Sequence, residues 1–226
     1  MRRYLFPLIL GLGGIAILLS LGFWQVSRLH WKETLLAAIN AKLSDAPVDL
    51  GTLPAPDPVT DRYQAVTATG MTAGQGLMVL SGRKGSGAGY EVIDALTTAS
   101  GRRVLIDLGF VPEADRTRPR PPRSLTVTGN LDWPKEADSY TPAPDLAANV
   151  WFARDVSAMA EKLQTEPVLV VLRTSDPADA SILPTPVDTS GIPNDHLGYA
   201  ITWFSLAAVW AGMTAYLLWR IRQRTA

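Results

Sequence analysis

The amino-acid sequence predicts a membrane protein of the α+β class, in which two transmembrane helices flank an extracytoplasmic domain built from an antiparallel, β-rich sheet or barrel. Two long uncharged apolar runs lie near the ends of the 226-residue chain. Short runs rich in β-branched residues lie between them, each bounded by glycine, proline or charge, which favours a compact antiparallel architecture. The chain therefore divides into an N-terminal transmembrane helix (1–24), a helical extension and proline-rich linker (25–60), a β-rich domain (61–195), a C-terminal transmembrane helix (196–219) and a basic cytoplasmic tail (220–226).

The first apolar run covers residues 4–24 and is long enough to cross about 30 Å of hydrocarbon at about 1.5 Å per residue. A cleaved signal peptide also begins with basic residues such as Arg2 and Arg3. However, the run exceeds the roughly 7 to 15 apolar residues of a signal peptide, and no small-x-small cleavage site follows it. These features favour a membrane anchor. Residues 25–43 lack glycine and proline and place leucines at helical spacing, so we expect the helix to continue beyond the bilayer.

The second apolar run, residues 197–219, is uncharged and is followed by Arg220, Arg222 and Arg224. Arginines outside both spans predict that both termini are cytoplasmic, although Arg28 and Lys32 beyond the first span weaken the contrast. The central segment is then extracytoplasmic. Because no long presequence rich in arginine and serine is present, we expect a bacterial inner membrane with a periplasmic domain, not a mitochondrial membrane.

Composition excludes several classes of protein. All 21 acidic residues lie between Glu33 and Asp195, and five of the 21 basic residues lie at the ends of the chain, at positions 2, 3, 220, 222 and 224. Residues 4–219 therefore have a net charge of −5 and the ends a net charge of +5. This segregation argues against a nucleic-acid partner, because a nucleic-acid binder clusters its basic residues on a folded domain. The absence of cysteine excludes disulfides, thiolate metal sites, covalent CxxCH haem and a cysteine nucleophile.

The central segment contains six runs that we expect to form strands and one that we expect to form a short helix. The strands are predicted over residues 63–71, 77–81, 90–96, 104–111, 125–131 and 168–172, and the helix over 156–163 with Asp155 as its N-cap. The glycine-rich stretch 81–90 is either a phosphate loop or a hairpin connection. A Walker motif is disfavoured because Lys84 precedes Gly85 and a strand follows, so we expect a hairpin. The basic, proline-rich stretch 116–123 is expected to be an exposed loop and not a ligand site.

No assembled catalytic group is present in the sequence. His-Glu-x-x-His, Gly-x-Ser-x-Gly and Ser/His/Asp arrangements are all missing, and only two histidines exist. We therefore do not predict an enzyme.

The junctions of the two spans with the central segment carry the strongest functional signal. Since antiparallel spans bring residues 21–32 and 194–204 to the same membrane face, Arg28, His30 and His196 are expected at similar depth. A non-covalent haem requires an axial ligand such as imidazole, an apolar slot and a counter-charge for its propionates. The alternative is that His196 and His30 are solvated interface histidines and that the aromatic residues Trp24, Tyr199 and Trp203 form an interfacial belt.

Two specific motifs occupy these junctions. Gly22, Trp24, Gln25, Arg28, Trp31 and Lys32 follow a Gly-x-Trp-Gln-x-x-Arg-x-x-Trp-Lys pattern; Asn194, His196, Leu197, Tyr199, Ala200, Thr202, Trp203 and Phe204 follow an Asn-x-His-Leu-x-Tyr-Ala-x-Thr-Trp-aromatic pattern. Weaker elements lie at 89–90, 109–112 and 151–155. Together they resemble the Surfeit-locus family of cytochrome c oxidase assembly proteins over nearly the whole chain. The sequence departs from that pattern at Asp107–Leu108, where an Asn- or Asp-Arg pair is expected, and at Asp195, which replaces a frequent Asn.

The resemblance implies a non-enzymatic assembly factor, a chaperone in the biogenesis of the respiratory chain, that handles haem a between haem a synthase and the catalytic subunit of a haem-copper oxidase. It implies that His196 is the axial iron ligand and the metal-binding residue, that Arg28 pairs with a propionate, and that Trp24, Tyr199 and Trp203 shape the haem slot. The isoprenoid tail would lie along the spans in the lipid bilayer. His30 is a second ligand only if the extended first helix leans over the slot.

Two other classes of function stay open. In a membrane-tethered scaffold, the β-domain would dock oxidase subunits without binding haem, and the junction motifs would only be packing surfaces. An extracytoplasmic enzyme on a two-span anchor is disfavoured because no catalytic group is assembled.

Overall fold

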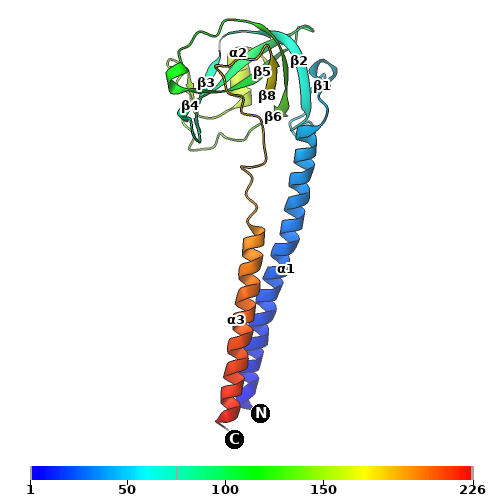
Figure 1. Cartoon of the computed structure of the whole chain (residues 1–226), viewed down its shortest axis with the longest axis vertical. Helices are drawn as coiled ribbons and strands as arrows, with labels where there is room; N and C mark the ends of the chain where they lie inside the picture. The colour runs from blue at the N-terminus through cyan, green and yellow to red at the C-terminus, as the bar shows by residue number, and fades with distance from the viewer. Residues whose placement is uncertain (1, 75, 225–226) are drawn as a thin grey trace. The chain divides into compact units, whose positions relative to one another are not determined.

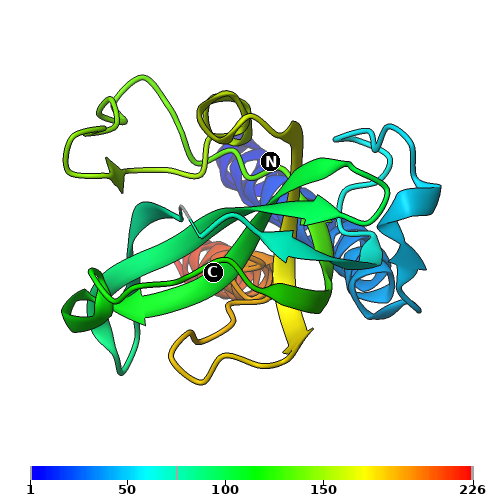
Figure 2. The same cartoon turned by 90° about the horizontal axis from the view of Figure 1, so that it is seen from above.

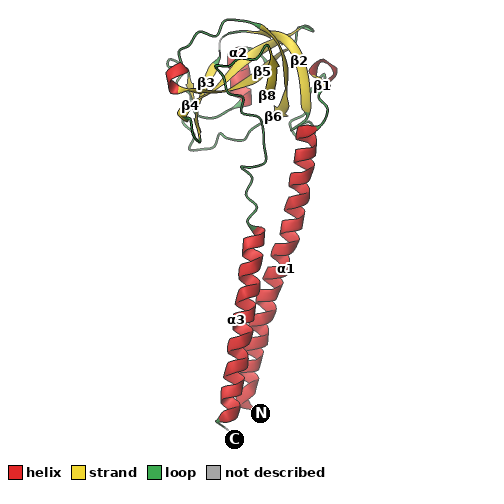
Figure 3. Ribbon diagram, in the orientation of Figure 1, coloured by secondary structure: helices red, strands yellow, loops and turns green. Residues whose placement is uncertain are grey.

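The computed structural model describes residues 2–74 and 76–224; Met1 of the first predicted span and residues 225–226 of the predicted basic tail lie outside the described residues. The chain divides into two units, a helical pair formed by residues 1–38 and 189–226, and a β-domain formed by residues 39–188. The elements of each are labelled in Figure 1 and coloured by type in Figure 3.

The helical pair consists of α1, Arg2–Ser44, and α3, His196–Gln223. Both helices are long and apolar enough to cross a membrane, and only about a tenth or less of each apolar window is buried. The first helix continues without interruption past its apolar run, as residues 25–43 predict. These two helices are those of a two-span membrane protein.

Small residues line the seam between α1 and α3. A side chain at Gly11, Gly14 or Gly22 would clash with α3, where the facing residues are Thr214, Trp210 and Phe204 in that order. The reversed order along α3 shows that the two helices run antiparallel, side by side in Figure 1. Ala200 and Ala207 are the buried residues of α3. Small residues at a membrane seam let the two backbones approach closely, because lipid offers no hydrophobic force between helices.

The β-domain contains eight strands in one sheet. They are β1 (Val48–Asp49), β2 (Ala65–Thr72), β3 (Leu77–Arg83), β4 (Gly87–Thr98), β5 (Arg103–Pro112), β6 (Ser124–Asp132), β7 (Val150–Trp151) and β8 (Glu166–Asp176). Their order is β1-β2-β6-β8-β5-β4-β3-β7. An additional pairing of β2 with β4, over three residue pairs at the strand ends, curls the sheet without closing it into a barrel, and Figure 2 shows the curved strands from above.

The sheet is mixed, which corrects the antiparallel arrangement that the sequence predicts. β1 pairs with β2, β7 with β3, and β8 with β5 in the parallel sense. The central pairing of β5 with β8 is possible because β6, β7 and α2 intervene in the chain and supply the long connection that parallel strands need.

The six predicted strands are all present, and helix α2, Val156–Leu163, is confirmed with its predicted cap: the Asp155 carboxylate accepts a 3.0 Å hydrogen bond from the amide of Ala158. The glycine-rich stretch connects β3 to β4 as a hairpin, also as predicted. Alternate strand residues face opposite sides. One side of the sheet forms a core with residues such as Val66, Ile106 and Leu131, and the other packs Leu105 and Leu169 against α2.

The proline-rich stretch after α1 is part of the folded domain, although the sequence indicates an extended linker. Its two-residue strand β1 is followed by a short 3₁₀ helix, η1, Leu50–Thr52; a second one, η2, Glu113–Asp115, follows β5. Leu50 is completely buried, and Arg102 donates hydrogen bonds to the carbonyls of Leu50 and Leu53 at 2.8 and 2.6 Å. Such tertiary contacts leave no periodic signal in a segment this short.

Polar side chains of the β-domain cap the carboxyl end of α1. The carbonyl of Leu43 accepts hydrogen bonds from Asn130 at 3.1 Å and from Arg173 at 2.8 Å, and Lys42 donates to the carbonyl of Thr60 at 2.8 Å. The first two bonds satisfy the Leu43 carbonyl, which the last turn of a helix leaves without an intrahelical donor, and the third ties α1 to the loop before β2. The last turn of α1 therefore belongs to the β-domain.

Candidate functional site

A hydrogen bond between His196 and Gln25 joins the two helices near the start of α3. The His196 Nδ1 atom lies 2.7 Å from the Gln25 Oε1 atom, and Gln25 is buried, with 8% of its surface exposed. Because an amide oxygen only accepts hydrogen bonds, Nδ1 carries the hydrogen in this pair. The Nε2 atom of the neutral ring then holds the free lone pair. The seam thus presents one imidazole nitrogen that the bond to Gln25 does not occupy.

The other predicted site residues lie on one flank of the helical pair. Viewed along the axis of α1, the side-chain directions of Trp24 and Arg28 are rotated from that of Gln25 by about 100° and about 60°, in the sense opposite to the winding of the chain. Viewed along the axis of α3, the side-chain directions of Tyr199 and Trp203 are rotated from that of His196 by about 60° and about 20°, in the same opposite sense. Because the helices are antiparallel, rotations in the same sense fall on the same side of the seam. Helical geometry therefore puts these four residues on one side of the helical pair, which we call the aromatic flank.

The opposite flank is filled by a ring contact. The rings of Phe23 and Phe204 meet edge to face with centroids 5.3 Å apart. The aromatic flank, in contrast, is open: Trp24 and Tyr199 are 54% and 57% exposed, and Trp203 is half-buried. A planar apolar group on this flank would find aromatic surface on both helices.

Arg28 supplies the positive charge of the aromatic flank. Its guanidinium carbon lies 4.3 Å from the centroid of the Trp31 ring, one turn farther along α1. Stacking on an aromatic ring leaves the planar guanidinium able to donate hydrogen bonds to an anion. The flank thus combines an imidazole nitrogen, aromatic surface and a cation.

His30 is not part of this arrangement. Its side chain is 73% exposed, and its Nδ1 atom lies 3.6 Å from the carboxylate of Glu33 on the same helix. Around α1, His30 is rotated about 140° forward from Gln25, away from the aromatic flank. These positions favour the reading of His30 as a solvated interface residue.

Gln25 is the residue that sequence reasoning missed. It belongs to the first junction motif, but the sequence analysis assigns it no role. The signal was available: a polar amide inside an uncharged helix needs a partner, since an unsatisfied polar group in an apolar environment is costly. What the sequence does not show is that the partner is His196.

The β-domain holds a second cluster of charged side chains, away from any predicted site. The carboxylate of Asp107 on β5 has no exposed surface and accepts a 3.0 Å hydrogen bond from the Arg154 guanidinium, which also pairs with Glu136. Burial raises the pKa of Asp107, although Arg154 opposes this shift. Burial also acts to raise the pKa of Glu136, but hydrogen bonds from Arg154 hold it below its usual value.

Glu91 on β4 completes this cluster. Its pKa is raised to about 7, first by burial and then by the negative charge of Asp107. Arg154 comes from the weak motif at 151–155 and Asp107 from the position that departs from the family pattern. Asp107 is therefore paired with Arg154, which lies farther along the chain, and not with an arginine at the next position.

The basic, proline-rich stretch 116–123 is a loop at the surface of the domain, as the sequence predicts. Arg116 stacks over the Tyr90 ring with its guanidinium carbon 4.8 Å from the centroid, and Arg118 and Arg123 pair with aspartates at 3.1 and 3.0 Å. These arginines are thus engaged within the domain.

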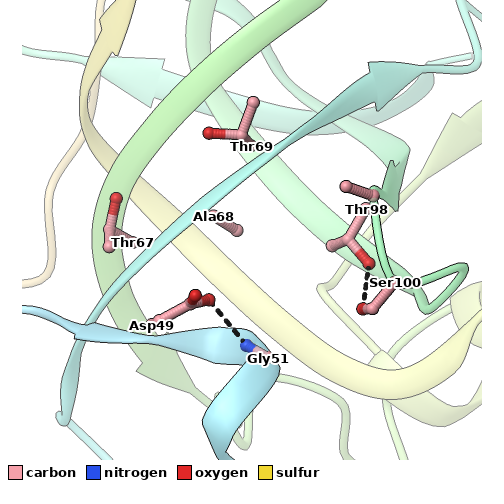
Figure 4. A pocket seen from close by; sticks show the side chains of 8 residues that line it. Asp49, Gly51, Thr67, Ala68, Thr69, Thr98 and Ser100 are labelled. Atoms are coloured by element: carbon pink, nitrogen blue, oxygen red, sulfur yellow. Dashed lines mark hydrogen bonds between the residues drawn. The ribbon is translucent and has the colours of Figure 1, made fainter.

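The β-domain also contains cavities, which are lined by residues other than the predicted site residues. Figure 4 shows one of about 290 Å³, lined by threonine and serine hydroxyls, in which Asp49 accepts from the Gly51 amide and Thr98 bonds to Ser100. Across residues 2–74 and 76–224, no three His, Cys, Asp or Glu residues gather as a metal site.

Fold and site together define a two-span membrane protein with a β-domain between its spans and a histidine at the helical seam. A model of the SURF1 family matches residues 12–208, so the chain belongs to the SURF1 family, as the junction motifs indicate. The chain is 30% identical over 201 residues to a SURF1-like protein of Rickettsia felis, covering 84% of this chain and 87% of that protein. A SURF1-like protein of Monosiga brevicollis is 31% identical over 216 residues (88% and 82% covered), and the Surfeit locus protein 1 of Xenopus tropicalis is 28% identical over 227 (88% and 70%).

SURF1 proteins are oxidase assembly factors, so membership supports a role in cytochrome c oxidase assembly and is consistent with a protein that is not an enzyme.

Proposed function

We propose that this protein binds haem a non-covalently at His196 and hands it over to the catalytic subunit of cytochrome c oxidase. The observation that carries the proposal is the bond from His196 Nδ1 to Gln25, which leaves Nε2 as a free ligand atom. A metal-binding histidine commonly donates its other ring N–H to a fixed acceptor, which sets the tautomer and the orientation of the ring. Gln25 has that position here.

The residues around His196 fit the rest of a haem. Haem a, when bound, supplies an iron atom that accepts an imidazole nitrogen as axial ligand. Trp24, Tyr199 and Trp203 offer aromatic surface to the macrocycle, and Arg28 offers a guanidinium that matches a carboxylate such as a propionate. All four residues lie on the aromatic flank, next to His196.

The isoprenoid tail of haem a also has a complementary surface. An apolar groove of about 330 Å³ lies between α1 and α3 farther along the spans, lined by residues that include Leu10, Trp210 and Leu217. Helical geometry places these three residues on the same side of the helical pair as the aromatic flank. A tail that leaves the macrocycle along this flank therefore stays in contact with apolar protein surface and with lipid.

In this proposal the protein lies in a bacterial inner membrane, with both termini cytoplasmic and the β-domain periplasmic. It receives haem a from haem a synthase and releases it to the oxidase. Bacterial relatives of the chain are consistent with this location.

The test is the visible absorption spectrum of the detergent-purified protein, produced in cells that synthesise haem a. We expect a stoichiometric haem a band in the wild type, its loss in His196→Ala, and weaker haem retention in Gln25→Leu. His30→Ala is the matched control, because it removes the other histidine of the chain from an exposed position, and it should keep the band. A colourless wild type that still co-purifies with oxidase subunits would contradict haem binding. That result would support the scaffold function, in which the β-domain docks those subunits without haem.

A further inference from the structure

The parallel strands β5 and β8 separate halfway along β8. Their pairing ends at Asp107 and Val171, whereas β8 continues through residues 172–176 and remains paired with β6 there. Beyond this point β5 pairs with a segment that follows β8: Leu183 and Phe110 exchange two backbone hydrogen bonds, at 2.8 and 2.9 Å. In the described part of the chain, residues 172–176 therefore have a strand partner on one edge only. We call the other edge the open edge.

A cavity of about 360 Å³ lies along the open edge. Residues 172–175 of β8 form one of its walls, and Leu108 of β5 and residues from the segment 178–184 form the others. Because alternate side chains of a regular strand point to opposite faces, a cavity that touches four consecutive residues lies along the edge of the strand and not over one face. Among the described residues, the backbone of 172–175 makes no hydrogen bond outside the sheet. The cavity thus gives access to backbone groups of β8 that can still pair.

The floor of this cavity is apolar. Leu108, Leu172 and Ile182 belong to the core of the domain, and each is 4% exposed. An apolar side chain that enters the cavity would remove further apolar surface from water, which is favourable.

Arg173 gives the cavity a positive charge. It lies where the register between β6 and β8 shifts, and the extra residue of such a bulge has its side chain redirected. Its guanidinium donates a 2.8 Å hydrogen bond to the Leu43 carbonyl but forms no ion pair with a described carboxylate. The other arginine of the lining, Arg123, pairs with Asp179 at 3.0 Å. Two arginines and one aspartate thus leave the lining with one positive charge in excess.

We propose that the open edge binds an extended segment of a partner protein by strand addition, and that this segment carries an acidic side chain between apolar ones. The main chain of the segment pairs with the free backbone groups of β8. Its apolar side chains cover the floor of the cavity, and its carboxylate accepts hydrogen bonds from the Arg173 guanidinium. A small anionic molecule would match the charge and the floor but would leave the edge of β8 unpaired, so the observations favour a polypeptide. The inference is independent of any haem at His196.

The test is calorimetric titration of the full-length protein in detergent with three blocked peptides. The first probe is acetyl-Thr-Val-Glu-Val-Thr-amide, and the second has Gln in place of Glu. The third is the first probe methylated at every internal peptide nitrogen, so that its backbone cannot donate hydrogen bonds. We expect saturable binding of the first probe, several-fold weaker binding of the second, and no binding of the third.

Hydrogen exchange and two variants locate the contact. The amides of residues 172–175 should gain several-fold protection when the first probe is bound. In Arg173→Met, the preference for the Glu probe over the Gln probe should fall several-fold, and comparing two probes in one variant cancels any effect of losing the bond to Leu43. Arg118→Met is the matched control, because the Arg118 side chain is 52% exposed and does not line the cavity, and it should keep the preference.

Three results would overturn the proposal. One is the absence of saturable binding of the first probe up to about 1 mM. Another is equal binding of the methylated probe, which would show that the backbone of β8 takes no part. The last is an unchanged preference for Glu in Arg173→Met, which would show that this arginine does not recognise the acid.

Discussion

The guanidinium of Arg154 donates a 3.0 Å hydrogen bond to Asp107, a carboxylate with no exposed surface. The same guanidinium pairs with Glu136, so one side chain compensates two acids from distant segments. Removing one partner of a buried ion pair leaves an uncompensated buried charge. We therefore expect Arg154→Met to lower the free energy of unfolding of the β-domain by about 3–5 kcal/mol, measured by denaturant titration in detergent.

Arg118→Met is the matched control for this variant. Arg118 pairs with Asp115 at 3.1 Å, but its side chain is 52% exposed. An exposed pair contributes about 0–1 kcal/mol, so this variant should unfold close to the wild type. Equal losses in the two variants would contradict the role assigned to Arg154.

The pH dependence of stability should carry the signature of Glu91. Its pKa is about 7 in the folded protein, against an ordinary value of 4.5 for a glutamate. The folded state thus binds the proton more tightly, so the stabilising contribution is complete below about pH 4.5 and is lost as the pH rises to about 7. Thermal unfolding midpoints across this range should fall for the wild type and fall less for Glu91→Gln. Parallel curves for the two proteins would show that another group is responsible.

The segment 182–185, called the strap, follows β8 and pairs with β5 through backbone hydrogen bonds between Leu183 and Phe110. Gly109 allows this segment to approach β5 closely. Its φ of +114° is in the region that favours glycine, and a Cβ atom there would clash with the Leu183 carbonyl. Gly109→Ala should destabilise the domain by about 1–3 kcal/mol and raise the exchange of the strap amides.

Gly101→Ala separates the two causes of this destabilisation, which are the unfavourable backbone conformation and the clash with the Leu183 carbonyl. Gly101 has a φ of +83°, but nothing lies within 4 Å of the position of its Cβ atom. It should show only the backbone cost, about 1 kcal/mol, and unchanged exchange in the strap. A loss equal to that of Gly109→Ala would mean that the strap contact contributes nothing.

The seam of the helical pair can be tested with two adjacent glycines. A side chain at Gly14 would clash with Trp210, whereas nothing lies within 4 Å of the Cβ position at Gly13. We expect Gly14→Leu to separate the two helices and Gly13→Leu to leave them packed. The chain has no cysteine, so spin labels on cysteines introduced at the exposed positions Ile9 and Met213 report the distance between α1 and α3. An unchanged distance in Gly14→Leu would contradict the close seam.

Local patterns predicted those elements whose signal lies within one segment. The apolar runs gave both spans, and the β-branched runs gave six strands, because periodicity and propensity are properties of neighbouring residues. Partners distant in the chain were not accessible. The parallel pairing of β5 with β8 and the burial of Leu50 depend on contacts that no local pattern records. At the candidate site, the aromatic and basic residues were named from the junction motifs, whereas the role of Gln25 required the distance to His196.

The place of β8 in the sheet has a consequence for how the domain is made. β8 is the last strand along the chain, yet it lies in the interior of the sheet and pairs with both β5 and β6. A nascent chain that has not yet delivered β8 leaves β5 and β6 with unpaired edges, which attract other strands. Productive folding must therefore wait until almost the whole domain has been synthesised, and a chain interrupted before this strand is a substrate for aggregation or proteolysis.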